Sequence, residues 1–282
     1  MNKNELNIKN LKNNYLNFFE NKNLLDELLG EVLFGFNEVN DFINNSEIKS
    51  VLEIGSGPGI LLCELKKIYP DIKMTGLEPL TSGYSRYKNI ITKIKNEKKN
   101  IKDLNFVNNK LEDFKTNEKF DLIFSINVLE HISDWKEYIE NTKKLLNSNG
   151  INIILCPNYD FPYESHYVIP IIINKKITKF FFNKIINKHD IKNNLSEHWE
   201  NINFVSKKKI GKYLTKNNYN YYFDEKIKNN EVGLWEGLHL TGKREIEKFL
   251  IKKNYTYFFD YSIKNTMIDR ILNDKEFKRR QG

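Results

Sequence analysis

Cysteine and long apolar runs are the features that this sequence has least of. Only two cysteines, Cys63 and Cys156, occur among 282 residues, and both lie in short apolar runs. Two such cysteines do not make a disulfide framework, so we expect a reducing compartment. No run approaches the roughly twenty apolar residues of a membrane span, and no N-terminal segment resembles a signal peptide. We therefore expect a cytoplasmic protein without a membrane span.

The sequence also lacks a concentrated patch of one charge. The formal net charge is +8 and the pI is about 9.1, so nucleic acid has to be considered as a partner. The lysines are scattered among acids, however, and the sharpest cluster, residues 207–209, is typical of a solvated face. No stripe of interleaved aromatic and basic residues is visible. A nucleic-acid partner is therefore not expected, whereas a phosphorylated or nucleotide-linked substrate suits a basic surface.

Internal repeats and the paired Asp, Glu and His spacing of a magnesium site are likewise not recognisable, so no metal site is predicted. What the chain does have is length and apolar content. Hydrophobic residues make up 40% of the 282, which is enough for one large α/β domain with additions.

A glycine-rich turn is the most informative segment that is present. Residues 51–62 read as a buried strand that carries Glu53, then a turn with Gly55, Gly57 and Gly59, then the start of a helix. Glycine reaches φ values closed to other residues and leaves no Cβ between the turn and a ligand. The helix N-terminus adds unpaired N–H groups and a positive dipole end. The spacing G-x-G-x-G differs from the G-x-G-x-x-G of dinucleotide sites, which disfavours an NAD-linked dehydrogenase.

A second carboxylate stands at the end of the next apolar strand. Glu78, followed by Pro79, lies twenty-one residues after Gly57. An acid at this place is suited to accept hydrogen bonds from the hydroxyl groups of a ribose.

These two segments, with residues 105–114 and 120–132, resemble the ordered motifs of class I S-adenosylmethionine (SAM) methyltransferases. The resemblance covers about residues 50–157, and the run FDLIFSINVLEHI at 120–132 is similar to the fourth-strand motif of small-molecule members. It implies SAM as cofactor and S-adenosylhomocysteine as product. The cofactor-binding residues that it implies are Glu53, Gly55, Gly57, Gly59, Glu78, Pro79, Leu111, Glu112 and Asn127. The chain departs from the family at Lys110, where many members carry an Asp that holds the adenine amino group.

The fold implied is a doubly wound, Rossmann-like α/β sheet with N-terminal helices and an insertion after strand five. We expect a helical cap at residues 1–49, a methyltransferase domain at 50–264 with a substrate-loop insertion at about 158–205, and a basic helix or tail at 265–282. Strands are predicted to end at Gly55 and Glu78 and to centre on Phe106 and Ile123, with helices at 60–69, 81–95 and 135–146. An Asn149-Gly150 helix stop should lead into a fifth strand at 151–156. Later helix–strand pairs are predicted at 206–216 with 219–223 and at 243–253 with 255–261.

The acceptor is expected above the ends of strands four and five, where the segment after strand five emerges. Its core, residues 162–167, resembles a stretch in methyltransferases of bacterial capsule and O-antigen loci. His166 is the preferred candidate base, because the ordinary pKa of histidine lies near working pH, with Glu164 orienting it or binding the acceptor. A loop histidine that only packs is the alternative. The substrate-binding candidates are Tyr159, Tyr163 and Tyr167.

Other histidines are weaker candidates. His131 is a possible base, although a histidine that packs under the cofactor site is the plainer interpretation. His198 and His239 are candidates for the pocket wall. Cys156 is at the place of the nucleophile of some RNA cytosine methyltransferases, but a buried strand cysteine is the commoner case.

The sequence therefore predicts a SAM-dependent O-methyltransferase whose small polar acceptor is a cell-surface carbohydrate precursor, such as a nucleotide-linked sugar, or its phosphate or phosphoramidate modification. A quinone-type O-methyltransferase and an RNA methyltransferase are the alternatives, and a non-catalytic SAM-binding module remains open. The oligomeric state does not follow from the sequence.

Overall fold

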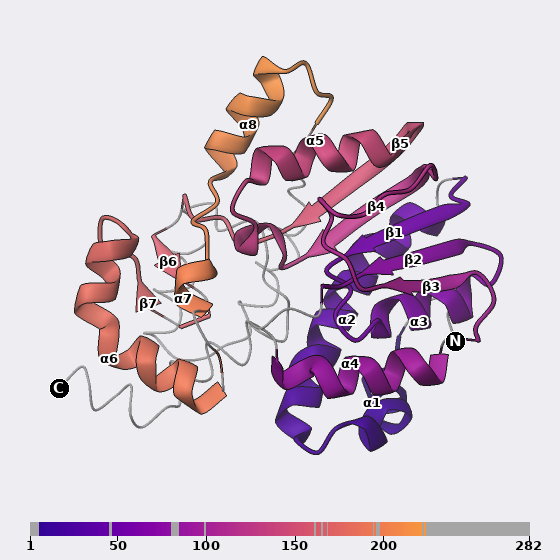
Figure 1. The fold of residues 1–282 in the computed structure, drawn as a ribbon, viewed down its shortest axis with the longest axis horizontal. Coiled ribbons are helices and arrows are strands. Elements are labelled where there is room, and N and C mark those ends of the chain that lie inside the picture. The colour runs from indigo at the N-terminus through magenta and orange to yellow at the C-terminus, as the bar shows by residue number, and fades with distance from the viewer. Residues whose placement is uncertain are drawn as a thin grey trace, which may run out of the picture. The chain divides into compact units, whose positions relative to one another are not determined.

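The protein was analysed as a computed structural model that describes residues 6–44, 47–79, 85–98, 100–160, 162–164, 166–167, 169–193, 195, 198–221 and 223. The chain divides into two compact units (Figure 1). The first comprises the chain up to Leu155 together with the short segment 194–201, and the second begins at Cys156 and resumes at Ile202.

A five-stranded parallel sheet forms the centre of the first unit. Its strands are β1 (Ser50–Ile54), β2 (Lys73–Leu77), β3 (Leu104–Val107), β4 (Phe120–Ile126) and β5 (Leu146–Leu155). Their order is β3-β2-β1-β4-β5, and every neighbouring pair is parallel. β1 is central, and four of its five residues are buried, as expected for a strand covered on both faces. The predicted doubly wound α/β fold is confirmed.

Helices cover both faces of this sheet. They are α1 (Ile8–Tyr15), η1 (Leu16–Phe18), α2 (Lys22–Asn44), α3 (Ile60–Ile68), α4 (Ser85–Lys98) and α5 (Trp135–Leu145). α2 and α3 pack on one face, where Val51, Leu122 and Phe124 join their apolar side chains in one core. α5 lies on the opposite face, seen in Figure 1, and its Thr142 hydroxyl accepts a hydrogen bond from Asn152 of β5 at 2.9 Å.

The N-terminal helix is fastened to α3 by a buried polar contact. The Tyr15 hydroxyl donates a hydrogen bond of 2.7 Å to Glu64 Oε1, and Lys67 pairs with the same oxygen at 2.5 Å. The ammonium of Lys67 also lies 5.7 Å from the centroid of the Tyr15 ring. Burial and the neighbouring acid raise the pKa of Tyr15, so the hydroxyl stays a donor. Because α3 begins at the glycine turn, this contact joins the N-terminal helices to the element that carries the turn.

The second unit contains two short antiparallel strands and two helices. These are β6 (Tyr163–Glu164), β7 (Ile169–Pro170), α6 (Lys175–Asn193) and α8 (Lys207–Lys216), whereas α7 (His198–Asn201) belongs to the first unit. Ser206 caps α8 through a hydrogen bond from the Lys209 N–H, which confirms the helix predicted at 206–216. None of the helices in the described part of the chain has the length and apolarity to cross a bilayer.

Two local predictions are wrong. Asn149 and Gly150 do not stop a helix; α5 ends at Leu145, and both residues lie inside β5, where the register with β4 shifts between Phe120 and Leu122. The turn-forming residues are thus used in an irregular stretch of strand. The strand predicted at 219–223 is also not found, because its four described residues have no strand assignment. The pair at 243–253 and 255–261, His239 and the tail 265–282 lie outside the described residues.

Candidate functional site

The glycine turn is held between the ends of the three central strands. The N–H groups of Gly55 and Ser56 both donate to the carbonyl of Leu77, at 2.8 and 2.9 Å. Gly55 has a φ of +74°, and a Cβ there would lie 2.3 Å from Cγ2 of Val128, the second residue after β4. The turn therefore needs glycine both for its conformation and for its close approach to the β4 loop.

Gly57 is the glycine of the turn that has free space where a side chain would stand. It has a φ of +49°, and a Cβ built on it would meet no atom within 4 Å. Its N–H donates to Glu78 Oε2 at 2.9 Å, so the turn and the second-strand carboxylate form one structure. Burial raises the pKa of Glu78, and this hydrogen bond and the charge of Lys95 oppose the rise. One carboxylate oxygen of Glu78 thus fixes the turn.

Glu53 is a buried acid beneath the turn. Its side chain is 5% exposed, and Oε2 has no hydrogen-bond partner among the described residues. Burial and the nearby charge of Glu78 raise the pKa of Glu53 to about 8, and Lys95 acts in the opposite direction. A buried carboxyl with an unused oxygen is a suitable partner for a cationic group of a ligand.

Asn127 extends this site to the end of β4. Its N–H donates to the carbonyl of Leu155 at 2.8 Å, and it has a φ of +53°, a conformation that asparagine tolerates better than most residues. The strand order reverses between β1 and β4, and ligands of open α/β sheets bind in the crevice at such a point. Glu53, Gly57, Glu78 and Asn127 therefore come from the strand ends at which a ligand is expected.

The residues predicted to contact adenine differ in character. Leu111 is 7% exposed, and Pro79 is partly buried. Glu112 is exposed, and its carboxylate lies 3.7 Å from the ammonium of Lys110. Both side chains of this pair are exposed.

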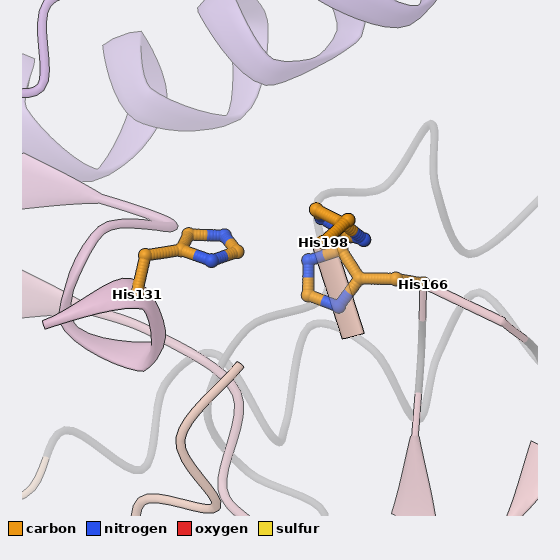
Figure 2. A group of neighbouring side chains, drawn as sticks. All are labelled: His131, His166 and His198. Atoms are coloured by element: carbon orange, nitrogen blue, oxygen red, sulfur yellow. The ribbon is translucent and has the colours of Figure 1, made fainter. Parts of the chain in front are cut away.

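Two histidines of the first unit lie beside each other. The ring centroids of His131 and His198 are 5.6 Å apart, and Figure 2 shows the two rings. His131 Nε2 also lies 4.0 Å from Oε1 of the buried Glu130. A ring nitrogen of His131 and one of His198 lie within 4.8 Å of each other. His198 thus lies beside His131 within the first unit.

The second unit contains a carboxylate–histidine pair. Glu164 is fully buried, and its Oε1 lies 2.7 Å from Nδ1 of His166, the third residue that Figure 2 labels. The Tyr159 hydroxyl donates to the same oxygen at 3.0 Å, and the Tyr167 N–H donates to Oε2 at 2.8 Å. Burial alone raises the pKa of a carboxyl group, but His166 and these hydrogen bonds lower the pKa of Glu164 below its ordinary value. Glu164 is therefore an ionised acceptor that holds three donors.

The three candidate tyrosines have separate surroundings. Tyr159 stacks on Phe204, with ring centroids 4.7 Å apart. Burial raises the pKa of Tyr163, which keeps its phenol neutral. The Tyr167 hydroxyl donates to Asp190 at 2.7 Å. Asp190 and Phe204 were not singled out from the sequence, because no local motif marks them.

The remaining sequence candidate is Cys156. Like Cys63, it is buried, and neither cysteine forms a disulfide among the described residues. Burial raises the pKa of the Cys63 thiol to about 12, so it stays protonated. A free thiol of this kind packs as a small apolar side chain.

Comparison with known proteins supplies the context. A family model described as a methyltransferase domain matches residues 21–222, more than half of the chain. An uncharacterized protein of Mycobacterium tuberculosis, Rv1509, is 29% identical over 170 residues, which are 59% of this chain and 56% of that protein. The ubiquinone biosynthesis O-methyltransferase of Rickettsia canadensis is 24% identical over 140 residues, 50% of this chain and 55% of that protein. The chain thus spans about half the length of the curated relatives it matches.

A solved structure to which this chain is similar is that of the plantazolicin methyltransferase BpumL in complex with S-adenosylhomocysteine. It is 21% identical, the match covers 54% of this chain and 52% of that chain, and the TM-score is 0.36.

Proposed function

This chain belongs to the methyltransferase-domain family, and from that premise we propose that it transfers the methyl group of SAM to an oxygen atom of a small polar acceptor. The acceptor class that we propose is a cell-surface carbohydrate precursor, either a nucleotide-linked sugar or a sugar with a phosphate or phosphoramidate group. S-adenosylhomocysteine is the second product.

The cofactor is SAM, and the strand ends of the first unit supply what it needs. Its sulfonium and ammonium groups are cationic, and Glu53 and Glu78 are the two carboxyl groups of the site. Its ribose presents hydroxyl donors, which Glu78 can accept while its other oxygen holds Gly57. The open face of Gly57 leaves the backbone accessible to the ligand.

The observation that carries the oxygen-directed reaction is the Glu164–His166 pair. An ionised carboxylate only accepts hydrogen bonds, so Nδ1 of His166 carries the hydrogen, and Nε2 holds the lone pair of the neutral ring. A carboxylate that orients a histidine in this way is the arrangement of a general base.

The step balances as an in-line displacement. The acceptor oxygen forms a bond to the methyl carbon while the carbon–sulfur bond breaks, and the electron pair of that bond stays on sulfur as a thioether. The hydroxyl proton passes to a base, the role that we propose for His166. Alignment of acceptor, methyl and sulfur supplies much of the acceleration, and the base adds roughly 10²–10⁴-fold.

A second acceptor class has its own support. The relatives named as ubiquinone biosynthesis O-methyltransferases, at 22–25% identity, favour a phenolic quinone precursor. A phenol ionises more readily than a sugar hydroxyl, so a phenolic acceptor depends less on a base. Against it, the second unit supplies a Tyr159–Glu164 and a Tyr167–Asp190 hydrogen bond, and such polar groups suit a hydroxylated acceptor.

The test starts with purified protein and SAM, screened against nucleotide sugars, phosphorylated sugars and demethylated quinone precursors, with product mass as the readout. On the accepted substrate, His166→Ala should lower kcat by about 10²-fold or more and leave the Kd for SAM unchanged. Glu164→Gln should lower kcat less. Lys184→Ala, an exposed residue of α6 in the same unit, is the control. A wild-type rate for His166→Ala would show that His166 is not the general base. Turnover of quinone precursors alone would favour the second acceptor class.

A further inference from the structure

Lys95 lies on the same face of the sheet as the cofactor-site acid Glu53. Across β3, β2 and β1, Phe106 pairs with Gly76 and Gly76 pairs with Glu53, so these three residues occupy one row. In a parallel sheet, residues paired in this way point to the same face. The ammonium of Lys95, which comes from α4, lies 5.3 Å from the centroid of the Phe106 ring at one end of this row.

Gly76 leaves the middle of the row without a side chain. A Cβ at Gly76 would lie 2.7 Å from Ser56 Oγ and 2.9 Å from Cδ1 of Leu62, so even a methyl group does not fit there. Beneath the glycine turn, therefore, no side chain of β2 separates the end occupied by Lys95 from the end occupied by Glu53.

Three buried polar atoms share this region. Lys95 Nζ, Glu53 Oε2 and Ser56 Oγ each have almost no accessible surface, and none has a hydrogen-bond partner within the described ranges. Leaving polar groups in this state costs free energy, and a buried charge costs more. A lysine buried in this way is explained if its charge serves the neighbouring acids.

The charges that act on one another here are few. Among the described residues, the charge of Glu78 raises the pKa of Glu53, and the charge of Lys95 lowers it. The charge of Lys95 also lowers the pKa of Glu78. The charge of Glu53 also raises the pKa of the Cys63 thiol, which comes from α3 and is neutral. Burial lowers the pKa of Lys95, and both acids oppose that change. Lys95 is thus the basic member of a group of three titratable side chains, and the two acids of this group belong to the proposed cofactor site.

We propose that Lys95 is a positioning residue of the cofactor site, whose ammonium favours the ionised forms of Glu53 and Glu78 and so prepares them for a cationic cofactor. The proposal rests on the assignment of SAM as cofactor. It gives SAM binding a pH dependence: affinity rises as Glu53 loses its proton, and Lys95 moves this rise to lower pH.

The experiment is isothermal calorimetry of SAM binding to the full chain from pH 6 to pH 9. Lys95→Met should move the rise in affinity to higher pH, and each pH unit of displacement is a tenfold change in Kd on the rising limb. We expect at least a tenfold weaker Kd at pH 7, with recovery toward pH 9. Lys95→Arg should keep the wild-type profile. Lys93→Met, an exposed lysine on the same helix, is the matched control and should also behave as wild type.

A double-mutant cycle separates charge from packing. If Lys95 acts through Glu53, adding Lys95→Met to Glu53→Gln should change the Kd much less than Lys95→Met does alone. The proposal would be overturned if Lys95→Met kept the wild-type affinity for SAM and the wild-type pH profile. It would also be overturned if Lys95→Met weakened SAM binding by the same factor in the wild-type and the Glu53→Gln backgrounds. If Lys95→Met does not fold, Lys95→Gln replaces it, with thermal unfolding as the check. Absence of SAM binding in the wild-type protein would instead refute the cofactor assignment.

Discussion

Glu53→Gln should change how the stability of the ligand-free protein depends on pH. The substitution keeps the shape of the side chain but removes its titration. In the folded protein the carboxyl has a pKa of about 8, against an ordinary value of 4.5. Between these values the folded chain keeps the proton and the unfolded chain has lost it, so wild-type stability falls as the pH rises.

The size of the effect follows from the two pKa values. Their difference, at about 1.4 kcal/mol per pH unit, amounts to about 5 kcal/mol between pH 4.5 and pH 8. This stability is present below pH 4.5 and is lost as the pH approaches 8. Glu53→Gln lacks this dependence. The free energy of unfolding of the variant, relative to that of the wild type, should therefore rise by about 1.4 kcal/mol per pH unit between pH 5 and pH 7.5.

Denaturant unfolding followed by circular dichroism, at half-unit pH intervals and without SAM, measures both proteins. The difference between the two curves removes the shared titrating groups that do not interact with Glu53, whereas Glu78 and Lys95 do interact with it. Asp121, whose pKa is lowered by four hydrogen bonds although burial opposes this, is one such shared group. Parallel stability curves would refute the reasoning, because they would mean that Glu53 titrates normally despite its burial.

Two further substitutions test the turn and the N-terminal contact. Gly57→Ala should destabilise the fold by only about 1–2 kcal/mol, which is the cost of the left-handed conformation. It should nevertheless abolish SAM binding measured by calorimetry, because the added methyl group enters the open face of the turn. Retained binding would show that the ligand avoids this face. Tyr15→Phe should lower the free energy of unfolding by about 1–3 kcal/mol, since buried Glu64 loses a hydrogen-bond donor. The Kd for SAM should stay the same. An unchanged midpoint of unfolding in urea would mean that Lys67 alone satisfies this acid.

Local sequence was sufficient for much of the first unit. The acid, the glycine turn and Glu78 follow from short motifs, because each strand delivers its last residues to the same edge of a parallel sheet. Lys95 could not be found in this way, since its place depends on how β3 pairs with β2 and on the missing side chain of Gly76. No pattern along α4 distinguishes it from the exposed Lys93.

In the second unit the sequence identified the pair but not its surroundings. Glu164 and His166 are two residues apart, so their contact is local. Phe204 and Asp190 reach Tyr159 and Tyr167 from distant segments, and single-sequence reasoning has no signal for such contacts. The Asn149-Gly150 prediction failed because a strong turn dipeptide was used inside a strand irregularity, where tertiary pairing overrides local preference.

The strand order also determines when the sheet can close during synthesis. β1 pairs with β2 soon after both leave the ribosome, but its other neighbour is β4, and Val51 pairs with Leu122 only after the intervening chain has been made. Until then the apolar strand that will become the centre of the sheet is an edge, with unpaired N–H and C=O groups that other nascent chains can join. A translational pause before Phe120 would lengthen this exposed interval, whereas a pause after Leu155 would leave time for all five strands to pair.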